Sequence, residues 1–197
     1  MIRLFRLLCV LFICVCTQLV CRDVLLEFKG AYNFFTNHHV RKIYGTGGGL
    51  YGPEVTFQIL EDDNWYGFAS ADFLKEKGHS SGMCEPTTLY MVPLALGAKY
   101  FVPFNRCDFY VGLGFQPLHV KTVNCIANTI QRTSKWGFGG IAKTGAYFDL
   151  PRDFFIDVFA DYSFVKVGGS PCCGTTVPVK SVMNSVAIGA GLGYRFD

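Results

Sequence analysis

The stretch Ser185–Phe196, which reads SVAIGAGLGYRF, decides the fold. Its even positions carry apolar or aromatic side chains, and its odd positions carry small or charged ones. Successive side chains of a β-strand point to opposite faces, so this alternation predicts a strand with one apolar and one polar face. Tyr194 and Phe196 end the apolar face, whereas Arg195 lies on the polar one.

The opposite end of the chain has the layout of a secretory signal peptide. A basic start precedes the apolar run Leu7–Cys16, and polar and charged residues follow it. The run is shorter than the roughly 20 residues that a membrane-spanning helix needs. A lipoprotein anchor at Cys21 is disfavoured because Val20 is larger than the small residue usual before such a cysteine. We expect residues 1–21 to be the signal, cleaved somewhere between 16 and 22, and residues 22–197 to be the exported barrel.

The composition favours a protein with much of its surface in lipid. Charged residues make up 17% of the chain, below the roughly 25% of ordinary soluble domains. Aromatic residues make up 16%, and 22 residues are glycine. Without the two arginines of the signal, 16 Lys and Arg face 15 Asp and Glu, so no basic field for nucleic acid exists. No further apolar run is long enough for a membrane helix, which leaves a closed barrel as the membrane architecture.

Eight alternating segments can be marked, at residues 24–35, 49–60, 64–74, 88–101, 108–120, 135–148, 154–167 and 184–196. The gaps between them alternate strictly between long and short. The short gaps are Glu61–Asn64, Pro103–Cys107 and Asp149–Asp153, and the long gaps are Thr36–Gly48, Lys75–Thr87, Lys121–Ser134 and Gly168–Met183. This rhythm predicts an all-β fold, an eight-stranded antiparallel up-and-down transmembrane β-barrel, with short periplasmic turns, four long extracellular loops and both termini in the periplasm.

The polar faces of these segments carry six acids and four bases that can pair inside a narrow lumen. They are Glu27, Lys29, Glu54, Asp72, Lys99, Asp108, Lys143, Asp157, Asp161 and Arg195. Glycines such as Gly191 and Gly112 share these faces and would make room for long charged side chains. Alternation alone also fits a soluble barrel with an apolar lumen and a polar exterior. The paired charges and the terminal strand favour the version with lipid outside.

The chain resembles the small eight-stranded outer-membrane proteins of bacteria, such as the OmpA transmembrane domain, OmpX and OmpW. The features that carry this resemblance are the strand rhythm, FYVGLGF at 109–115 and GLGYRF at 191–196. The last strand is similar to the assembly signal of that family, with Tyr194 and Phe196 as its aromatic residues. Asp197 departs from the pattern, because the aromatic residue usually comes last. The resemblance implies integration in the outer membrane by the barrel-assembly machinery and contact with outer-membrane lipid and lipopolysaccharide.

No motif for catalysis, a cofactor or a metal emerges, so we expect no enzyme activity, no cofactor and no metal site. The resemblance draws attention to His79, Ser80 and Ser81 with Glu85 nearby, since lipid A deacylases of this fold use a His, a Ser and an acid. In those enzymes the serine and the histidine lie on a strand that faces lipid, whereas His79, Ser80 and Ser81 of this chain fall in a predicted loop. The glycine-rich stretch 45–49 lacks the Gly-Lys-Ser/Thr ending of a phosphate-binding loop.

Five cysteines follow the signal segment. Cys84, Cys125, Cys172 and Cys173 fall in long gaps and therefore on one side of the membrane. Export permits disulfides, and an adjacent Cys172–Cys173 bond would strain the backbone, so we expect one of the two to pair with Cys84 and the other with Cys125. Cys107 falls in a short turn on the other side and is left for an intermolecular bond to an envelope protein.

The expected function is structural and interactive: an outer-membrane barrel that presents four extracellular loops to a host surface or another partner. The long gaps lean basic, which suits lipopolysaccharide phosphates or sulfated glycans as well as simple solubility. One alternative is a narrow channel for small or apolar solutes, and a second is a lipid A-modifying enzyme. Eight strands leave an interior only wide enough for side chains, so a wide pore is not expected.

The terminal strand generates the first prediction. Replacing Tyr194 and Phe196 together by alanine removes both aromatic side chains of the assembly signal, and we expect much less folded barrel in the outer membrane. Folded barrel is measured by the shift of its gel band on heating. A double variant that accumulates folded barrel in wild-type amounts would contradict the assembly-signal hypothesis.

Overall fold

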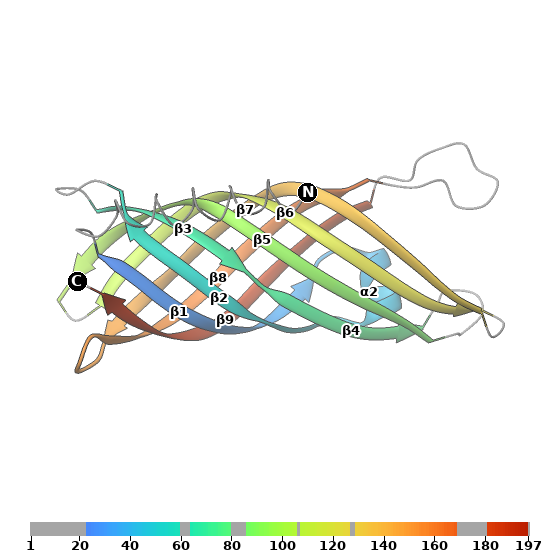
Figure 1. The fold of residues 1–197 in the computed structure, drawn as a ribbon, viewed down its shortest axis with the longest axis horizontal. Helices are drawn as coiled ribbons and strands as arrows, with labels where there is room; N and C mark the ends of the chain where they lie inside the picture. The colour runs from blue at the N-terminus through green and yellow to red at the C-terminus, as the bar shows by residue number, and fades with distance from the viewer. Residues whose placement is uncertain are drawn as a thin grey trace, which may run out of the picture.

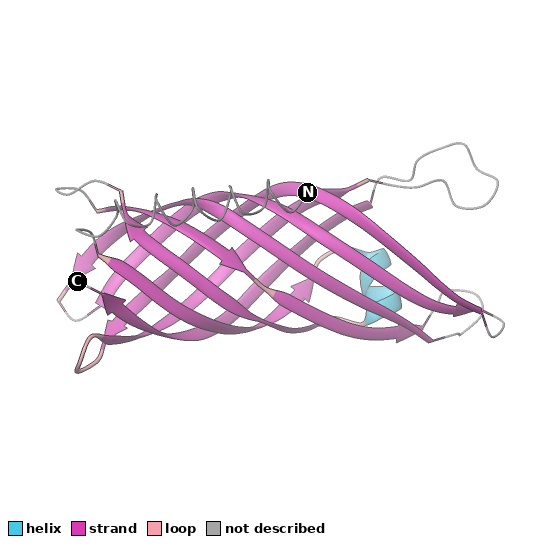
Figure 2. Cartoon of the chain, viewed as in Figure 1, coloured by secondary structure: helices cyan, strands magenta, loops and turns pink. Residues whose placement is uncertain are grey.

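The structure is a computed structural model and describes residues 23–59, 64–79, 86–105, 107–126, 129–168 and 181–196. In these residues one antiparallel sheet closes on itself, with a short helix at one end (Figures 1 and 2). The elements are β1 (Val24–Phe35), α2 (His38–Tyr44), β2 (Gly47–Gln58), β3 (Trp65–Ala71), β4 (Phe73–His79), β5 (Pro86–Phe104), β6 (Cys107–Ile126), β7 (Thr129–Asp149), β8 (Phe154–Val167) and β9 (Ser181–Phe196).

The barrel has eight strands because β3 and β4 are two parts of one strand. Both pair with β2 on one side and β5 on the other, in one unbroken register. The interruption falls at Asp72, whose backbone N–H donates to the carbonyl of Pro93 over 2.9 Å. Pro93 has no N–H to return the second bond, so the ladder is weakened at this point. The predicted eight-stranded antiparallel barrel is confirmed.

The register closes the ring with a defined stagger. Starting at Val24 and moving from strand to strand, the pairs run through Phe57, Gly67, Ala98, Leu113, Ala142, Tyr162 and Val186 and return to β1 at Phe34, ten residues further along. This stagger tilts the strands against the barrel axis. A closed ring of eight strands has an interior that side chains can fill.

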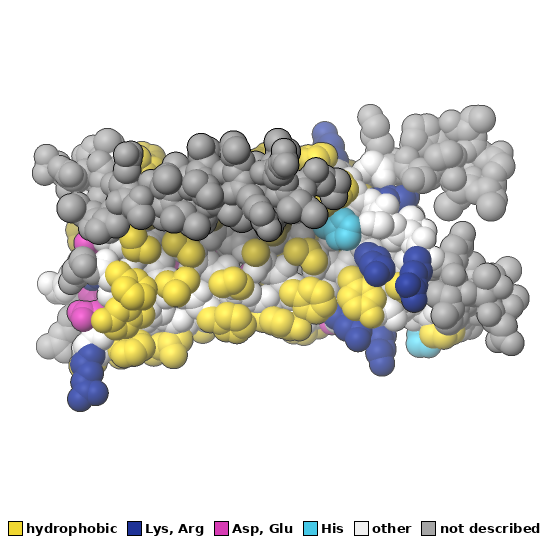
Figure 3. Space-filling view, viewed as in Figure 1, with side chains coloured by type: hydrophobic (Ala, Val, Ile, Leu, Met, Phe, Trp, Pro, Cys, Tyr) yellow, Lys and Arg dark blue, Asp and Glu magenta, His cyan; other side chains and the backbone are white. Residues whose placement is uncertain are grey.

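The outward face forms a wide apolar belt (Figure 3). Leu96, Phe104 and Leu113, for example, are 61%, 63% and 73% exposed. Charged side chains such as Lys99 and Asp157 point inward and are fully buried. The apolar belt therefore faces lipid, and the alternative of a soluble barrel with an apolar lumen and a polar exterior is excluded.

Two of the four predicted long loops are wrong over most of their length. In Lys75–Thr87, β4 continues to His79 and β5 begins at Pro86; in Lys121–Ser134, β6 continues to Ile126 and β7 begins at Thr129. Above the membrane a strand no longer needs an apolar outward face. The apolar alternation therefore stops before the hydrogen-bonded ladder does, and the sequence pattern placed the strand ends too early.

The other gaps differ in character. Thr36–Gly48 contains α2, whereas most of Gly168–Met183 lies outside the described residues. Pro103–Cys107 and Asp149–Asp153 are tight connections, as predicted, while residues 60–63 are not described. Val24 pairs with Phe196, so both ends of the described chain lie at the end of the barrel with the short turns.

A glycine contact inside the barrel generates the second prediction. A Cβ at Gly193 would lie 2.2 Å from the Cζ atom of Phe155, whose ring is fully buried. We expect Gly193→Val to lower the free energy of unfolding by about 1–3 kcal/mol, since the ring must leave its position. Urea unfolding in lipid vesicles measures this change.

Gly30→Val is the matched control, because a Cβ at Gly30 meets no atom within 4 Å. Equal losses of stability in the two variants would show that the cost comes from valine in a strand and not from Phe155.

Candidate functional site

Seven of the ten ionisable residues assigned to the lumen meet in one layer inside the barrel. This charge layer consists of Glu27, Lys29, Glu54, Lys99, Lys143, Asp157 and Asp161. Each is at most 7% exposed. The residues come from β1, β2, β5, β7 and β8, and all occupy inward positions of the alternation.

Glu54 is the centre of the charge layer, since its carboxylate pairs with all three lysines. Its Oε1 atom pairs with the ammonium of Lys99, and its Oε2 atom lies 2.9 Å from Nζ of Lys143 and 3.3 Å from Nζ of Lys29. Lys29 also pairs with Asp157 at 3.0 Å, and Lys143 with Asp161 at 2.8 Å. Charges this far from water are tolerated only when each has close partners of opposite sign.

Two tyrosines complete the layer and were not among the predicted site residues. The hydroxyl of Tyr147 accepts a hydrogen bond from Lys99 over 3.0 Å and donates one to Glu27 over 2.8 Å. The hydroxyl of Tyr110 donates to Asp157 over 3.0 Å. Both tyrosines share the inward face with charged residues of their strands, which was the available signal. The high aromatic content of the chain suggests contact of aromatic side chains with lipid instead.

Small residues make the layer possible. A Cβ at Gly191 would lie 3.1 Å from Oε2 of Glu27 and 3.2 Å from Cγ of Lys29. A Cβ at Gly112 would lie 3.0 Å from Cγ of Lys99. Both glycines therefore lie where long charged side chains cross the lumen.

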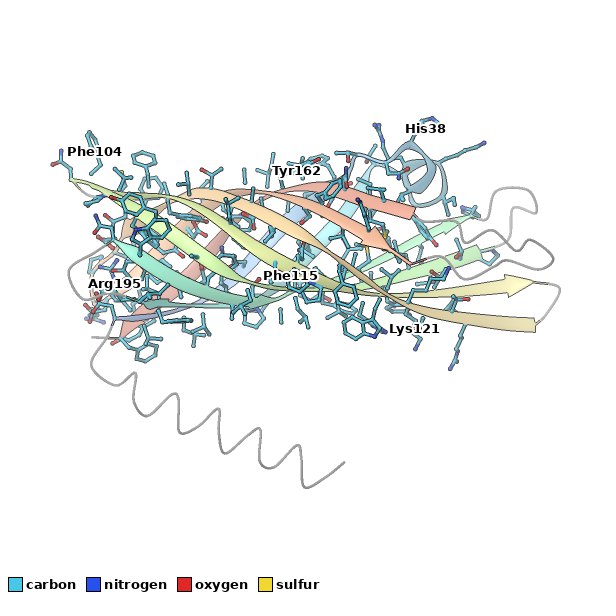
Figure 4. All side chains as sticks on the ribbon, turned by 90° about the horizontal axis from the view of Figure 1, so that it is seen from above. His38, Phe104, Phe115, Lys121, Tyr162 and Arg195 are labelled. Carbon is cyan, nitrogen blue, oxygen red and sulfur yellow. The ribbon has the colours of Figure 1, made fainter. Side chains whose placement is uncertain are left out.

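The other three predicted lumen residues lie apart from this layer. Arg195 and Asp108 occupy the end of the barrel with the short turns, where the guanidinium lies 3.7 Å from Asp108 and 3.4 Å from Asp149 (Figure 4). Their side chains are roughly a quarter to a half exposed. Asp72 lines a small cavity on the other side of the layer, together with Gln116 and Asp161.

Apolar side chains fill the lumen on both sides of the charge layer. Toward the short turns the filling includes Leu25, Phe101 and Phe155. Toward the other end lies an apolar plug, which consists of Phe35, Leu74, Leu89, Met91, Leu118, Val120, Val165 and Val167. Val40 and Tyr44 of α2 pack against the plug. The cavity between plug and charge layer has a volume of about 30 Å³, room for about two water molecules.

The histidines do not assemble into a metal site among the described residues. His119 lies on the outward face, where its Nε2 atom is 2.7 Å from Oγ of Ser134 and its ring packs on Trp136 at 4.8 Å. A serine–histidine pair needs a third group to orient the base, and within the described part of the chain His119 has no carboxylate partner. Ser80, Ser81 and Glu85 lie outside the described residues.

The predicted disulfides remain predictions. Cys84, Cys172 and Cys173 lie outside the described residues, as does the side chain of Cys125. Cys107 is a free thiol at the end with the short turns, and its Sγ donates to the carbonyl of Phe104 over 3.5 Å.

In the terminal strand, the Tyr194 and Phe196 rings lie 4.7 Å apart.

No family model matches the sequence, and no curated protein matches it. Among solved structures, the barrel is similar to a major outer membrane protein from Thermus thermophilus, with a TM-score of 0.57 and 13% identity over 88% of this chain and 99% of that one. It is similar to outer membrane protein W of E. coli, with a TM-score of 0.54 and 16% identity over 89% and 98%. The chain has the fold of the small outer-membrane β-barrels.

Ail of Yersinia pestis, in a structure with the heparin analogue sucrose octasulfate, gives a TM-score of 0.54 at 15% identity, over 89% of this chain and 99% of Ail. Identities this low establish the fold and leave the activity open. The expected architecture is confirmed, and the outward apolar belt is consistent with an outer-membrane location. Within the described residues, no helix is both long and apolar enough to cross a membrane.

The charge layer generates the third prediction. Lys143→Met leaves Glu54 and Asp161 with one buried partner fewer, and we expect a loss of about 3–5 kcal/mol in the free energy of unfolding. Arg195→Met removes two partly exposed ion pairs, with Asp108 and Asp149, and should cost about 1 kcal/mol or less. Urea unfolding of both variants in lipid vesicles compares them directly. Equal losses would mean that the charge layer contributes no more than an exposed ion pair.

Proposed function

We propose that this protein is a closed outer-membrane barrel that acts through its surfaces and does not conduct solutes. The filled lumen carries this proposal. A solute would have to separate the ion pairs around Glu54 and then pass the apolar plug, which α2 covers. Both steps are costly, because one breaks buried charge pairs and the other opens packed side chains.

The end of the barrel with α2 is the surface through which we expect it to act. Arg41 and Lys42 on α2 are exposed, and the first turn of the helix carries no acid. Lys77 and Arg132 add further exposed positive charge on β4 and β7. Sulfated and other anionic saccharides fit such a surface through charge-assisted hydrogen bonds. Ail supports this idea, since a barrel of this fold has been solved with a heparin analogue.

Conductance in planar lipid bilayers tests the closed lumen, and this is the fourth prediction. We expect the folded wild-type protein to produce no discrete current steps. Replacing Leu89 and Leu118 of the plug by glycine opens the packing and serves as a comparison for residual leak. Regular current steps from the wild-type protein would favour the narrow-channel alternative.

Binding of intact cells to immobilised heparin tests the saccharide hypothesis. Arg41→Gln with Lys42→Gln should weaken binding by about tenfold, since each exposed charge contributes roughly 0.5–1 kcal/mol. Arg152→Gln, in the turn at the opposite end, is the control and should bind as the wild type does. Undiminished binding by the double variant would contradict the hypothesis without affecting the closed-lumen proposal.

A further inference from the structure

A row of outward side chains crosses four neighbouring strands beyond the edge of the apolar belt. In the register of the sheet, Lys75 of β4 pairs with Tyr90 of β5, Tyr90 with Lys121 of β6, and Lys121 with Ser134 of β7. Lys75 and Lys121 therefore lie on either side of Tyr90, about 10 Å apart at two strand spacings. Nζ of Lys75 lies 5.4 Å from the centre of the Tyr90 ring.

The neighbouring row, on the side of the lipid-facing belt, is aromatic. His119 pairs with Trp136 there, and their rings pack at 4.8 Å. The hydrogen bond between His119 and Ser134 ties this row to the basic one. Further into the belt, the rings of Phe115 and Phe138 stack at 6.1 Å. The order from lipid to exterior is thus apolar, then aromatic, then basic, which is the order found across a membrane interface.

The charge in this region has one sign. Basic side chains gather where the hydrophobic belt ends (Figure 3), and Lys121 lies in the half of the barrel away from Arg195 (Figure 4). Of the described acids toward that end, Glu76 and Asp72 occupy inward positions of the strand that carries Lys75. Within the described part of the chain, neither Lys75 nor Lys121 forms an ion pair. Two ammonium groups without an acidic partner among these residues therefore face the layer where lipid headgroups lie.

We propose that Lys75 and Lys121, with Tyr90, His119 and Trp136 beside them, form a binding site for the phosphorylated saccharide headgroup of an outer-leaflet lipopolysaccharide. The ammonium groups would pair with its phosphate, and the aromatic rings would contact its sugar and the upper part of its acyl chains. Ion pairs at the edge of the hydrocarbon layer are stronger than in bulk water, because the local dielectric constant is lower. The site continues the lipid-facing belt and does not depend on the saccharide proposal for α2.

Lipid binding to the full-length folded protein in detergent micelles tests this site. Trp65 and Trp136 are the two tryptophans of the chain, so in a Trp65→Phe background the fluorescence of Trp136 reports on the site. Titration with lipid A that carries its phosphates should change this fluorescence, whereas dephosphorylated lipid A should bind about tenfold more weakly. Lys75→Gln with Lys121→Gln should weaken binding of the phosphorylated lipid by a similar factor.

The controls separate phosphate recognition from general effects. Arg152→Gln removes one charge at the opposite end and should leave binding unchanged, and Lys75→Arg with Lys121→Arg should retain it. Only protein with the heat-dependent gel shift of a folded barrel is compared. Equal binding of phosphorylated and dephosphorylated lipid A, or wild-type binding by the glutamine variant, would overturn the proposal. Inorganic phosphate that binds as tightly as lipid A would overturn its assignment to a lipid.

Discussion

The structure depends on one constraint: in lipid, every backbone N–H and C=O group must find its partner within the protein. The ladder meets this constraint by running from β1 around the ring to β9 and back to β1. Even at Asp72, where Pro93 cannot donate, the register on both neighbours continues unchanged. Closure with eight strands fixes a narrow interior, and everything inside the barrel follows from how that space is filled.

The side chains that fill the lumen separate the interior, which stabilises the barrel, from the outer surface, which is available to ligands. Inside, the carboxylates and ammonium groups around Glu54 pair with one another, and the plug around Leu89 and Leu118 fills the lumen between this layer and α2. None of these groups is free to meet a ligand. Ligands are therefore expected to bind at the outer surface, where Lys75, Lys121, Arg41 and Lys42 are exposed. The first two lie beside the lipid-facing belt, and the last two lie on α2.

The alternation of apolar and polar residues predicted much of the fold, because successive side chains of a strand point to opposite faces and one face here contacts lipid. The predicted segments 24–35 and 154–167 coincide with β1 and β8. The strand ends beyond the membrane were missed, since lipid no longer selects apolar side chains there. The apolar plug was missed as well, although the unbroken apolar stretch Leu89–Leu96 offered a signal: both faces of β5 are apolar where the plug fills the lumen. The contacts of Tyr110 and Tyr147 depend on residues far along the chain, which periodicity cannot show.

The distribution of the charge layer over the chain has a consequence for assembly. Glu54 lies early in the chain, on β2, but two of its three lysine partners lie on β5 and β7. Lys29 of β1 likewise pairs with Asp157 on β8. A sheet that had entered the bilayer before β7 and β8 were in place would expose unmatched charges to hydrocarbon. Insertion is therefore energetically coupled to completion of the ring. We expect a sheet that lacks β7 and β8 to remain at the membrane surface until these strands have paired.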